Sequence, residues 1–305
     1  MSNKVKSVSK KYAINEFKTV GLVLILYCLF VLFVPLVLDE LNILFGEITF
    51  FGIDAYRIAH IACIVIGTVI PFMLLRISSK KKLSDFFASS GLTLSNHLVN
   101  YVVFFVAIAA SVFVTMMLGQ FINVSGELVS SIGLTLNEEY MSDIFYVLAF
   151  ILITPIVEEY AFRGCLLFCL SKYGKYFAYI ASSIIYALAH GSFVEMIPAF
   201  FMGLILSKMA LKYKSIRPTI VIRILFNLTL YGLSLVPERF SLYMIVGLAI
   251  VFVLAAVLII TKEYNFITIK KSNSNKQVTL LFFSTFTVCF AAILFILHTV
   301  LLLAI

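Results

Sequence analysis

Charged residues are scarce in this sequence of 305 residues, where Asp, Glu, Lys and Arg make up only 12% of the chain and Trp is absent. Soluble domains are close to one quarter charged, so this composition excludes an ordinary soluble protein. Hydrophobic residues make up 62% of the chain and recur in continuous runs of ~20 residues. A single signal peptide does not explain runs spread along the whole chain, and their lack of alternation argues against a transmembrane β-barrel. The sequence therefore predicts an all-α, polytopic membrane helical bundle.

The distribution of basic residues argues against nucleic-acid binding as the reason for the net charge of +8. Lys and Arg stand mostly in short connections between apolar runs, which is where the residues that orient a membrane protein stand. The cysteines all lie inside apolar runs, where free cysteine behaves as a small buried hydrophobe. We therefore expect packing roles for them and no disulfide framework. They are Cys28, Cys63, Cys165, Cys169 and Cys289.

Basic and acidic connections alternate along the chain. Residues 1–16 form a basic head, expected in the cytoplasm, whereas residues 39–54 and the connection after the third apolar run contain no Lys or Arg. The positive-inside rule then predicts about nine transmembrane helices, with eight as the alternative, a cytoplasmic N-terminus and an outside C-terminus. We expect one membrane domain over residues 1–305, in a multi-pass protein of a bacterial plasma membrane. The expected spans are residues 17–38, 57–75, 98–118, 143–170, 176–190, 196–211, 217–235, 242–260 and 278–303.

The fourth apolar run contains three charged residues within six positions: Glu158, Glu159 and Arg163. An ionised side chain at the centre of a bilayer costs at least ~2.5–3.5 kcal/mol. Such residues therefore need partners inside the bundle. Glu159 and Arg163 are four residues apart on one helix face and are expected to form an ion pair. That pair leaves Glu158, about 100° further round the helix, to point elsewhere.

Two other helices are expected to bring polar side chains to a similar depth. At a rise of ~1.5 Å per residue, Glu158 and His190 each lie roughly 21–22 Å from the basic end of their helix, and Asn227 lies roughly 15 Å from it. Each of these side chains is costly to place against lipid. They are thus predicted to meet around one shared pocket.

Glu, His and Asn side chains in a recessed cavity of low dielectric constant suit the hydrolysis of a carbonyl compound. A buried carboxylate accepts a proton from water and so acts as a general base near neutral pH. A neighbouring His orients that water or donates to a leaving group, and an Asn amide stabilises a developing oxyanion. Together these groups indicate the addition of water to a carbonyl, most naturally that of a peptide bond.

The pattern of these residues resembles the CAAX-protease and bacteriocin-processing family of intramembrane endopeptidases, also called CPBP or Abi. Its first motif, Glu-Glu-x-x-x-Arg, is matched in full by residues 158–163. Its second motif, Phe-x-x-x-His, is matched by residues 186–190 with Tyr for Phe. Its third motif, His-x-x-x-Asn, is matched by residues 223–227 with Arg for His. The resemblance covers residues 144–235, which we expect to form the core of the protein.

The resemblance implies a peptide hydrolase in which Glu158 activates water, His190 is its partner and Asn227 assists at the oxyanion. It also implies a peptide or protein substrate, a membrane-anchored one included, next to the lipid bilayer. We expect no cofactor, because the other histidines, among them His298, lie outside the motifs and a catalytic zinc ion usually has three protein ligands. Dependence on a metal such as zinc is the alternative. The expected supporting residues are Glu159, Arg163, Tyr186 and Arg223.

The arginine in the third motif leaves two functions open. Arg223 stays protonated and cannot act as an acid or base, but it can support an oxyanion and so preserve proteolysis. It can equally pair with Glu158 and remove the base. The chain would then be an inactive family member that serves as a membrane scaffold or as a regulator of a membrane or cell-envelope partner protein. Bacteriocin self-immunity and the regulation of a sensor kinase or cell-wall enzyme are examples of such roles.

Other interpretations rank lower. A transporter that uses the buried charges as a proton site is one, but no inverted repeat or broken helix is visible in the sequence. A second is an ionic lock at residues 158–163 that only fixes helix packing. The second Glu-Glu pair, at residues 138–139, has no Arg four residues later and is expected to be a solvated loop edge.

Overall fold

The described residues form an almost entirely helical molecule, which confirms the predicted all-α membrane bundle. The computed structural model describes residues 10–45, 49–50, 53–89, 91, 94–122, 147–235 and 276–304, together with the single residues 239, 247, 250, 253 and 257. Within this part of the chain, the strands form one short antiparallel hairpin in which Thr49 pairs with Asp54 and Phe50 with Ile53.

The elements before the central segment are α1 (Lys10–Cys28), η1 (Leu29–Phe33), α2 (Val34–Phe45), β1 (Thr49–Phe50), β2 (Ile53–Asp54), α3 (Ala55–Ser78), η2 (Leu83–Phe86) and α4 (Leu94–Ile122). The central segment consists of η3 (Ala149–Ile153), α8 (Thr154–Glu158), η4 (Glu159–Leu167), α9 (Phe168–Leu170) and η5 (Ser171–Tyr173). The elements after it are α10 (Lys175–Leu188), α11 (Phe193–Tyr213), α12 (Arg217–Ser234), α14 (Lys276–Phe283) and α15 (Phe286–Ala304). Of the short pieces, η1, η3 and η4 are wide π-helical turns, and η2 and η5 are tight 3-10 turns.

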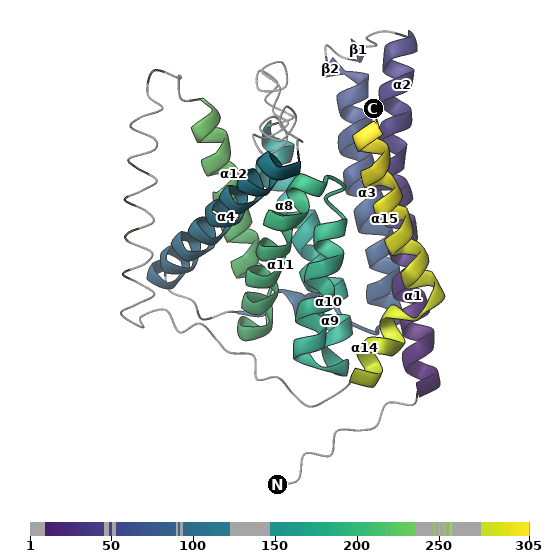
Figure 1. Ribbon diagram of the computed structural model, residues 1–305. Helices are drawn as coiled ribbons and strands as arrows, with labels where there is room; N and C mark the ends of the chain where they lie inside the picture. Colours follow the sequence, from purple (N-terminus) through teal and green to yellow (C-terminus); the bar gives the residue numbers. More distant parts are fainter. Residues whose placement is uncertain are drawn as a thin grey trace.

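Other helices enclose the central segment. It packs against α3 on one side and against α10, α11 and α12 on the others. α1 lies along α15 and α3, and these helices form the layer at the right of Figure 1. α4 crosses obliquely in front of α11 and α12. The three sequence motifs therefore lie on helices at the centre of the bundle.

Small residues hold α10 and α11 close together. A Cβ atom at Gly203 of α11 would lie only 3.0 Å from both Cα and Cβ of Ser183 of α10. Small residues at helix contacts let two backbones approach each other in this way. The Ser182 and Ser207 hydroxyls, 3.2 Å apart, share a hydrogen bond across the same contact. α10 and α11 are thus fixed as a pair, and both contribute side chains to the site described below.

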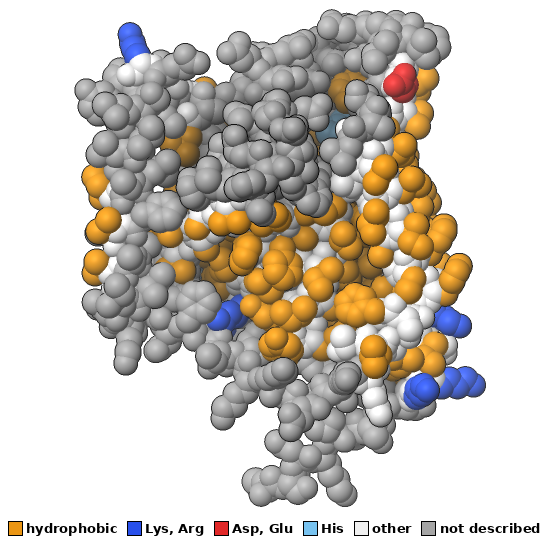
Figure 2. All heavy atoms as spheres, in the orientation of Figure 1, with side chains coloured by type: hydrophobic (Ala, Val, Ile, Leu, Met, Phe, Trp, Pro, Cys, Tyr) orange, Lys and Arg blue, Asp and Glu red, His pale blue; other side chains and the backbone are white. Residues whose placement is uncertain are grey.

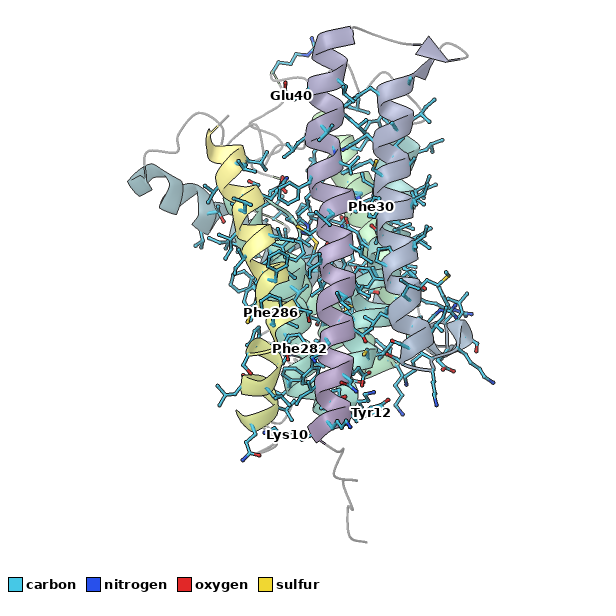
Figure 3. All side chains as sticks on the ribbon, turned by 90° about the vertical axis from the view of Figure 1, so that its right-hand side faces the viewer. Lys10, Tyr12, Phe30, Glu40, Phe282 and Phe286 are labelled. Atoms are coloured by element: carbon cyan, nitrogen blue, oxygen red, sulfur yellow. The ribbon has the colours of Figure 1, made fainter. Side chains whose placement is uncertain are left out.

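Hydrophobic and charged side chains are distributed over the outer surface as in a membrane protein. Three described helices are long and apolar enough to cross a membrane, over Lys10–Leu38, Ile58–Ser78 and Glu195–Tyr213, and the bent pair Gln277–Phe283 and Phe286–Leu302 is a fourth if it is one span. Hydrophobic side chains cover the middle of the face in Figure 2, and most of its visible Lys and Arg lie below them. Lys10 and Tyr12 mark one end of the α1–α2 helix and Glu40 lies near the other, as Figure 3 shows.

Two of the spans expected from the sequence differ from the helices in the structure. The first helix continues to Phe45, so the expected acidic loop begins later than residue 39. The last expected span, at residues 278–303, is bent by 59° between α14 and α15. The hydroxyls of Ser284 and Thr285 both donate to the Leu281 carbonyl, at 3.2 and 2.8 Å. Such bonds compete with the backbone ladder and favour a bend.

Some expectations lie outside the described residues. These are the connection after α4, with the Glu-Glu pair at 138–139, and most of the expected eighth span at 242–260. The number of spans therefore stays a prediction.

Candidate active site

Glu158 is the last residue of a short α-helical segment that lies between two π-helical turns. It ends α8 and is followed directly by the π-helical η4, while η3 precedes α8. Pro155 lies between them; it has no N–H to donate to the carbonyl of residue 151 and so interrupts the α-helical ladder. Wide turns of this kind occur often at functional sites. The local sequence thus places the two adjacent carboxylates where the helix is irregular.

One oxygen of Glu158 is held by two donors. Its Oε2 accepts a hydrogen bond from Arg223 Nη2 at 2.5 Å and another from the Tyr186 hydroxyl at 2.9 Å. Its Oε1 accepts none from the residues that the structure describes. The Glu158 side chain is 19% exposed, whereas that of Arg223 is 6% exposed. The carboxylate therefore has one anchored oxygen and one open oxygen.

Glu159 forms the ion pair that its spacing predicts. Its Oε1 lies 2.8 Å from Arg163 Nη1, and both side chains are buried, at 0% and 1% exposure. The Arg163 guanidinium carbon also lies 3.9 Å from the centre of the Tyr186 ring, as in a cation–π contact. The two neighbouring carboxylates therefore have different partners: Glu159 is tied to its own helix, and Glu158 faces α10 and α12.

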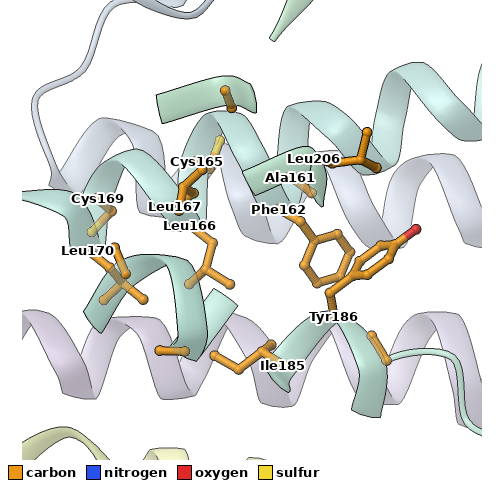
Figure 4. Close-up of a cluster of buried hydrophobic side chains, with 14 of the residues drawn as sticks. Ala161, Phe162, Cys165, Leu166, Leu167, Cys169, Leu170, Ile185, Tyr186 and Leu206 are labelled. Carbon is orange, nitrogen blue, oxygen red and sulfur yellow. The ribbon is translucent and has the colours of Figure 1, made fainter. Parts of the chain in front are cut away.

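Tyr186 connects the polar and apolar parts of the site. Its ring packs edge-on against Phe162, with ring centres 5.0 Å apart. Figure 4 shows the two rings facing each other in the buried cluster, with the Tyr186 hydroxyl pointing away from the labelled apolar side chains. That hydroxyl donates to Glu158 and also lies 3.5 Å from the sulfur of Met202. A phenylalanine would supply the same ring packing but could not donate the hydrogen bond to Glu158.

His190 lies one helical turn beyond Tyr186. Its Nδ1 is 2.8 Å from the Tyr186 carbonyl oxygen. Because a carbonyl only accepts hydrogen bonds, Nδ1 carries a proton, and in the neutral imidazole Nε2 is then the acceptor. The His190 ring packs edge-on against the Tyr186 ring, with centres 4.6 Å apart, and interacts electrostatically with Glu158.

Asn227 lies one turn beyond Arg223 on α12, but its amide group is directed at a different element. Its Nδ2 donates to the Phe150 carbonyl in η3 at 2.8 Å. The bond ties α12 to the wide turn that precedes Glu158. The structure therefore brings Glu158, Tyr186, His190 and Arg223 into one cluster, whereas Asn227 is placed at its edge.

Several buried polar atoms in this cluster have no hydrogen-bond partner among the described residues. They are Glu159 Oε2, Arg163 Nε, Arg163 Nη2 and Arg223 Nε. Buried polar groups are nearly always satisfied by protein or by ordered water. A buried water makes about three hydrogen bonds to groups of this kind. The cluster therefore holds polar atoms that could bond to water or to a substrate.

The donor set around Glu158 does not fit a zinc site. Within the described residues there is no group of three or more His, Cys, Asp and Glu side chains arranged to hold a metal ion. The anchored oxygen of Glu158 is also bonded to the Arg223 cation, which opposes a second cation at that atom.

A further buried carboxylate, Glu16, lies outside the three sequence motifs. It lies in α1 and is only 8% exposed. Its Oε1 accepts from Cys169 at 2.9 Å and from Ser79 at 3.3 Å. Its Oε2 accepts from the Tyr173 hydroxyl at 2.6 Å and pairs with Lys172. An acidic residue followed directly by a long apolar run was the signal that could have found it.

The fold and the cluster define a class: an integral membrane protein of the all-α type with a polar site at the centre of its bundle. Residues 140–229 match the family model described as type II CAAX prenyl endopeptidase Rce1-like. This match confirms the resemblance that the three motifs indicated, and it contains all seven candidate residues. The matched segment is less than a third of the chain. No curated protein and no solved structure matches the chain.

Proposed function

We propose that this protein is an intramembrane endopeptidase that hydrolyses a peptide bond with water activated by Glu158. The observation that carries the proposal is the asymmetry of this carboxylate, which has one oxygen anchored by Arg223 and Tyr186 and the other open. An anchored carboxylate with a free oxygen is oriented to accept a proton from water. The family description supports a CAAX-type peptide as the first substrate class to test.

The reaction follows from these positions. Glu158 Oε1 takes a proton from water, and the hydroxide adds to the peptide carbonyl. In this proposal the Arg223 guanidinium, which lacks a partner at Nε among the described residues, stabilises the oxyanion, and Asn227 on the next turn of α12 assists it. The intermediate collapses as its C–N bond breaks, and the protonated Glu158 returns the proton to the leaving amine. In this scheme His190, with Nε2 free to accept, orients the attacking water.

A specific observation also favours a second function. The 2.5 Å pair between Glu158 and Arg223 stabilises the charged carboxylate, and a strongly stabilised carboxylate is a weaker base. In the extreme case the cluster is an ionic lock, and the chain is a membrane scaffold or regulator without turnover. The endopeptidase requires Glu158 to accept a proton from water, whereas the scaffold or regulator does not.

The test is cleavage of a prenylated CAAX peptide by the purified protein in lipid nanodiscs, with the unprenylated peptide in parallel. Glu158→Gln keeps the shape of the side chain and removes the base. We expect it to reduce the cleavage rate ~10²–10⁴-fold, which is the usual contribution of a general base. Glu40→Gln makes the same chemical change at an exposed position and is expected to cleave at the wild-type rate. Equal cleavage by Glu158→Gln and wild type would rule out this mechanism.

A further inference from the structure

The turn that follows α10 contains His190 and Gly191, and it is in close contact with a second histidine. Gly191 has a φ of +71°, a conformation that residues with a Cβ rarely adopt. A Cβ atom at this position would lie 2.7 Å from Cε1 and 2.8 Å from Nδ1 of His298. The His298 ring therefore rests directly on the backbone of the turn, and glycine is the residue that fits there.

His298 lies in α15, far outside the segment that matches the family. It is 5% exposed. Its ring packs edge-on against Phe33 of η1, with ring centres 5.6 Å apart, and it also faces the backbone of Leu32. The imidazole thus fills the space between the turn and the first helix of the chain. The imidazole also interacts by hydrogen bonding with the backbone of Gly191 and of Leu32.

A displacement of this turn would alter His190 directly. The ring of His190 is oriented by its bond to the Tyr186 carbonyl, and its own backbone N–H donates to the Ala187 carbonyl at 3.1 Å. Gly191 is the next residue and donates to the Leu188 carbonyl at 3.2 Å. His298 is the side chain that contacts the turn from α15, so its ring limits how far the turn can move toward that helix.

We propose that His298 is a positioning residue for His190: held between Gly191 and η1, its imidazole sets the position of the turn and so of the His190 ring. This inference rests on the proposed function, in which His190 orients the attacking water. It also assigns a role to α15, which lies outside residues 140–229 and packs against α1 and α10.

The test compares three substitutions in the full chain in nanodiscs. His298→Leu fills a similar volume but cannot hydrogen-bond to the backbone of the turn, His298→Gln keeps a polar group that can donate and accept, and Thr299→Val is the matched control. Thr299 is also buried in α15, but its hydroxyl bonds to the Phe295 carbonyl of its own helix at 3.0 Å. Two quantities are measured: kcat and KM for peptide cleavage, and the rate at which diethyl pyrocarbonate modifies His190, read by mass spectrometry.

We expect His298→Leu to lower kcat ~10–100-fold without a change in KM, since small misplacements of a reacting group have effects of this size. The same variant should raise the modification rate of His190. His298→Gln should recover most of both values, and Thr299→Val should match wild type. If His298→Leu does not accumulate, His298→Ala removes the ring without adding bulk and takes its place.

Wild-type values of both kcat and His190 modification in the His298→Leu protein would overturn the proposal. Equal losses in His298→Leu and Thr299→Val would also overturn it, because they would reflect helix packing alone. Absence of cleavage by the wild-type protein would instead refute the proposed function. The modification rate of His190 would still decide whether His298 holds the turn.

Discussion

The protein buries two unlike groups of charges, one around Glu158 and one around Glu16. Both oxygens of Glu16 have donors, from Cys169 and Ser79 on one and from Tyr173 and Lys172 on the other. Glu158 has two donors on one oxygen and none from the described residues on the other. A satisfied buried carboxylate stabilises packing, whereas a half-satisfied one next to unpaired donors is suited to bind water or substrate.

The largest effect is expected from substitutions of Arg223. Arg223→Leu removes both the anchor of Glu158 and the donor for the oxyanion, and we expect cleavage to fall ~10²–10³-fold. Arg223→His keeps a donor and should remain closer to wild type. The measurement is the rate of peptide cleavage by equal amounts of membrane-inserted protein. A strong gain of activity in Arg223→His over an inactive wild type would show that the arginine locks the site.

The second substitution is Glu16→Leu, and it is expected to affect stability without affecting chemistry. Loss of the acceptor removes the hydrogen bonds that Cys169 and Ser79 donate to Glu16, which costs ~1–3 kcal/mol. The midpoint of thermal unfolding should fall, while cleavage at a temperature well below it should not change. A loss of cleavage in a protein that is still folded would contradict the assignment of Glu16 to packing.

The class of fold and the helices that carry the site could be predicted from the sequence, because membrane spans and the charges within them are local signals. The Glu159–Arg163 pair follows from its spacing alone. The partner of Glu158 does not: Arg223 is 65 residues away, and its direction depends on how α12 packs against α8. Glu16 and the bend between α14 and α15 were missed for a similar reason, since each depends on contacts or hydrogen bonds that no periodic pattern encodes.

A smaller effect is expected from Tyr186→Phe, which keeps the ring and removes one of the two bonds to Glu158. A hydrogen bond to a charged group contributes ~1.5–3 kcal/mol, so kcat should fall roughly 10- to 150-fold, while the ring and its packing are kept. Steady-state kinetics would show this. A total loss of activity would mean that the hydroxyl takes part in the reaction itself.

The smallest effect is expected at Lys172, the partly exposed partner of Glu16. Burial by itself lowers the pKa of Lys172, but the hydrogen bond and charge of Glu16 outweigh it and raise the pKa above its ordinary value. A raised pKa means that the stabilisation is complete at neutral pH and is lost only as the pH rises through that value. Solvent screens the pair, so Lys172→Met should cost at most ~1 kcal/mol at pH 7. Unfolding curves at pH 7 and in alkaline buffer would measure both effects.

The central claim is that Glu158 activates water for peptide hydrolysis, and single-turnover cleavage in ¹⁸O-labelled water tests it most directly. We expect one ¹⁸O atom in the new carboxylate of the product, no label in the peptide that contains Glu158, and formation of the product ~10²–10⁴-fold more slowly by Glu158→Gln. Label transferred into Glu158, or the same labelled product formed at the wild-type rate by Glu158→Gln, would contradict the claim.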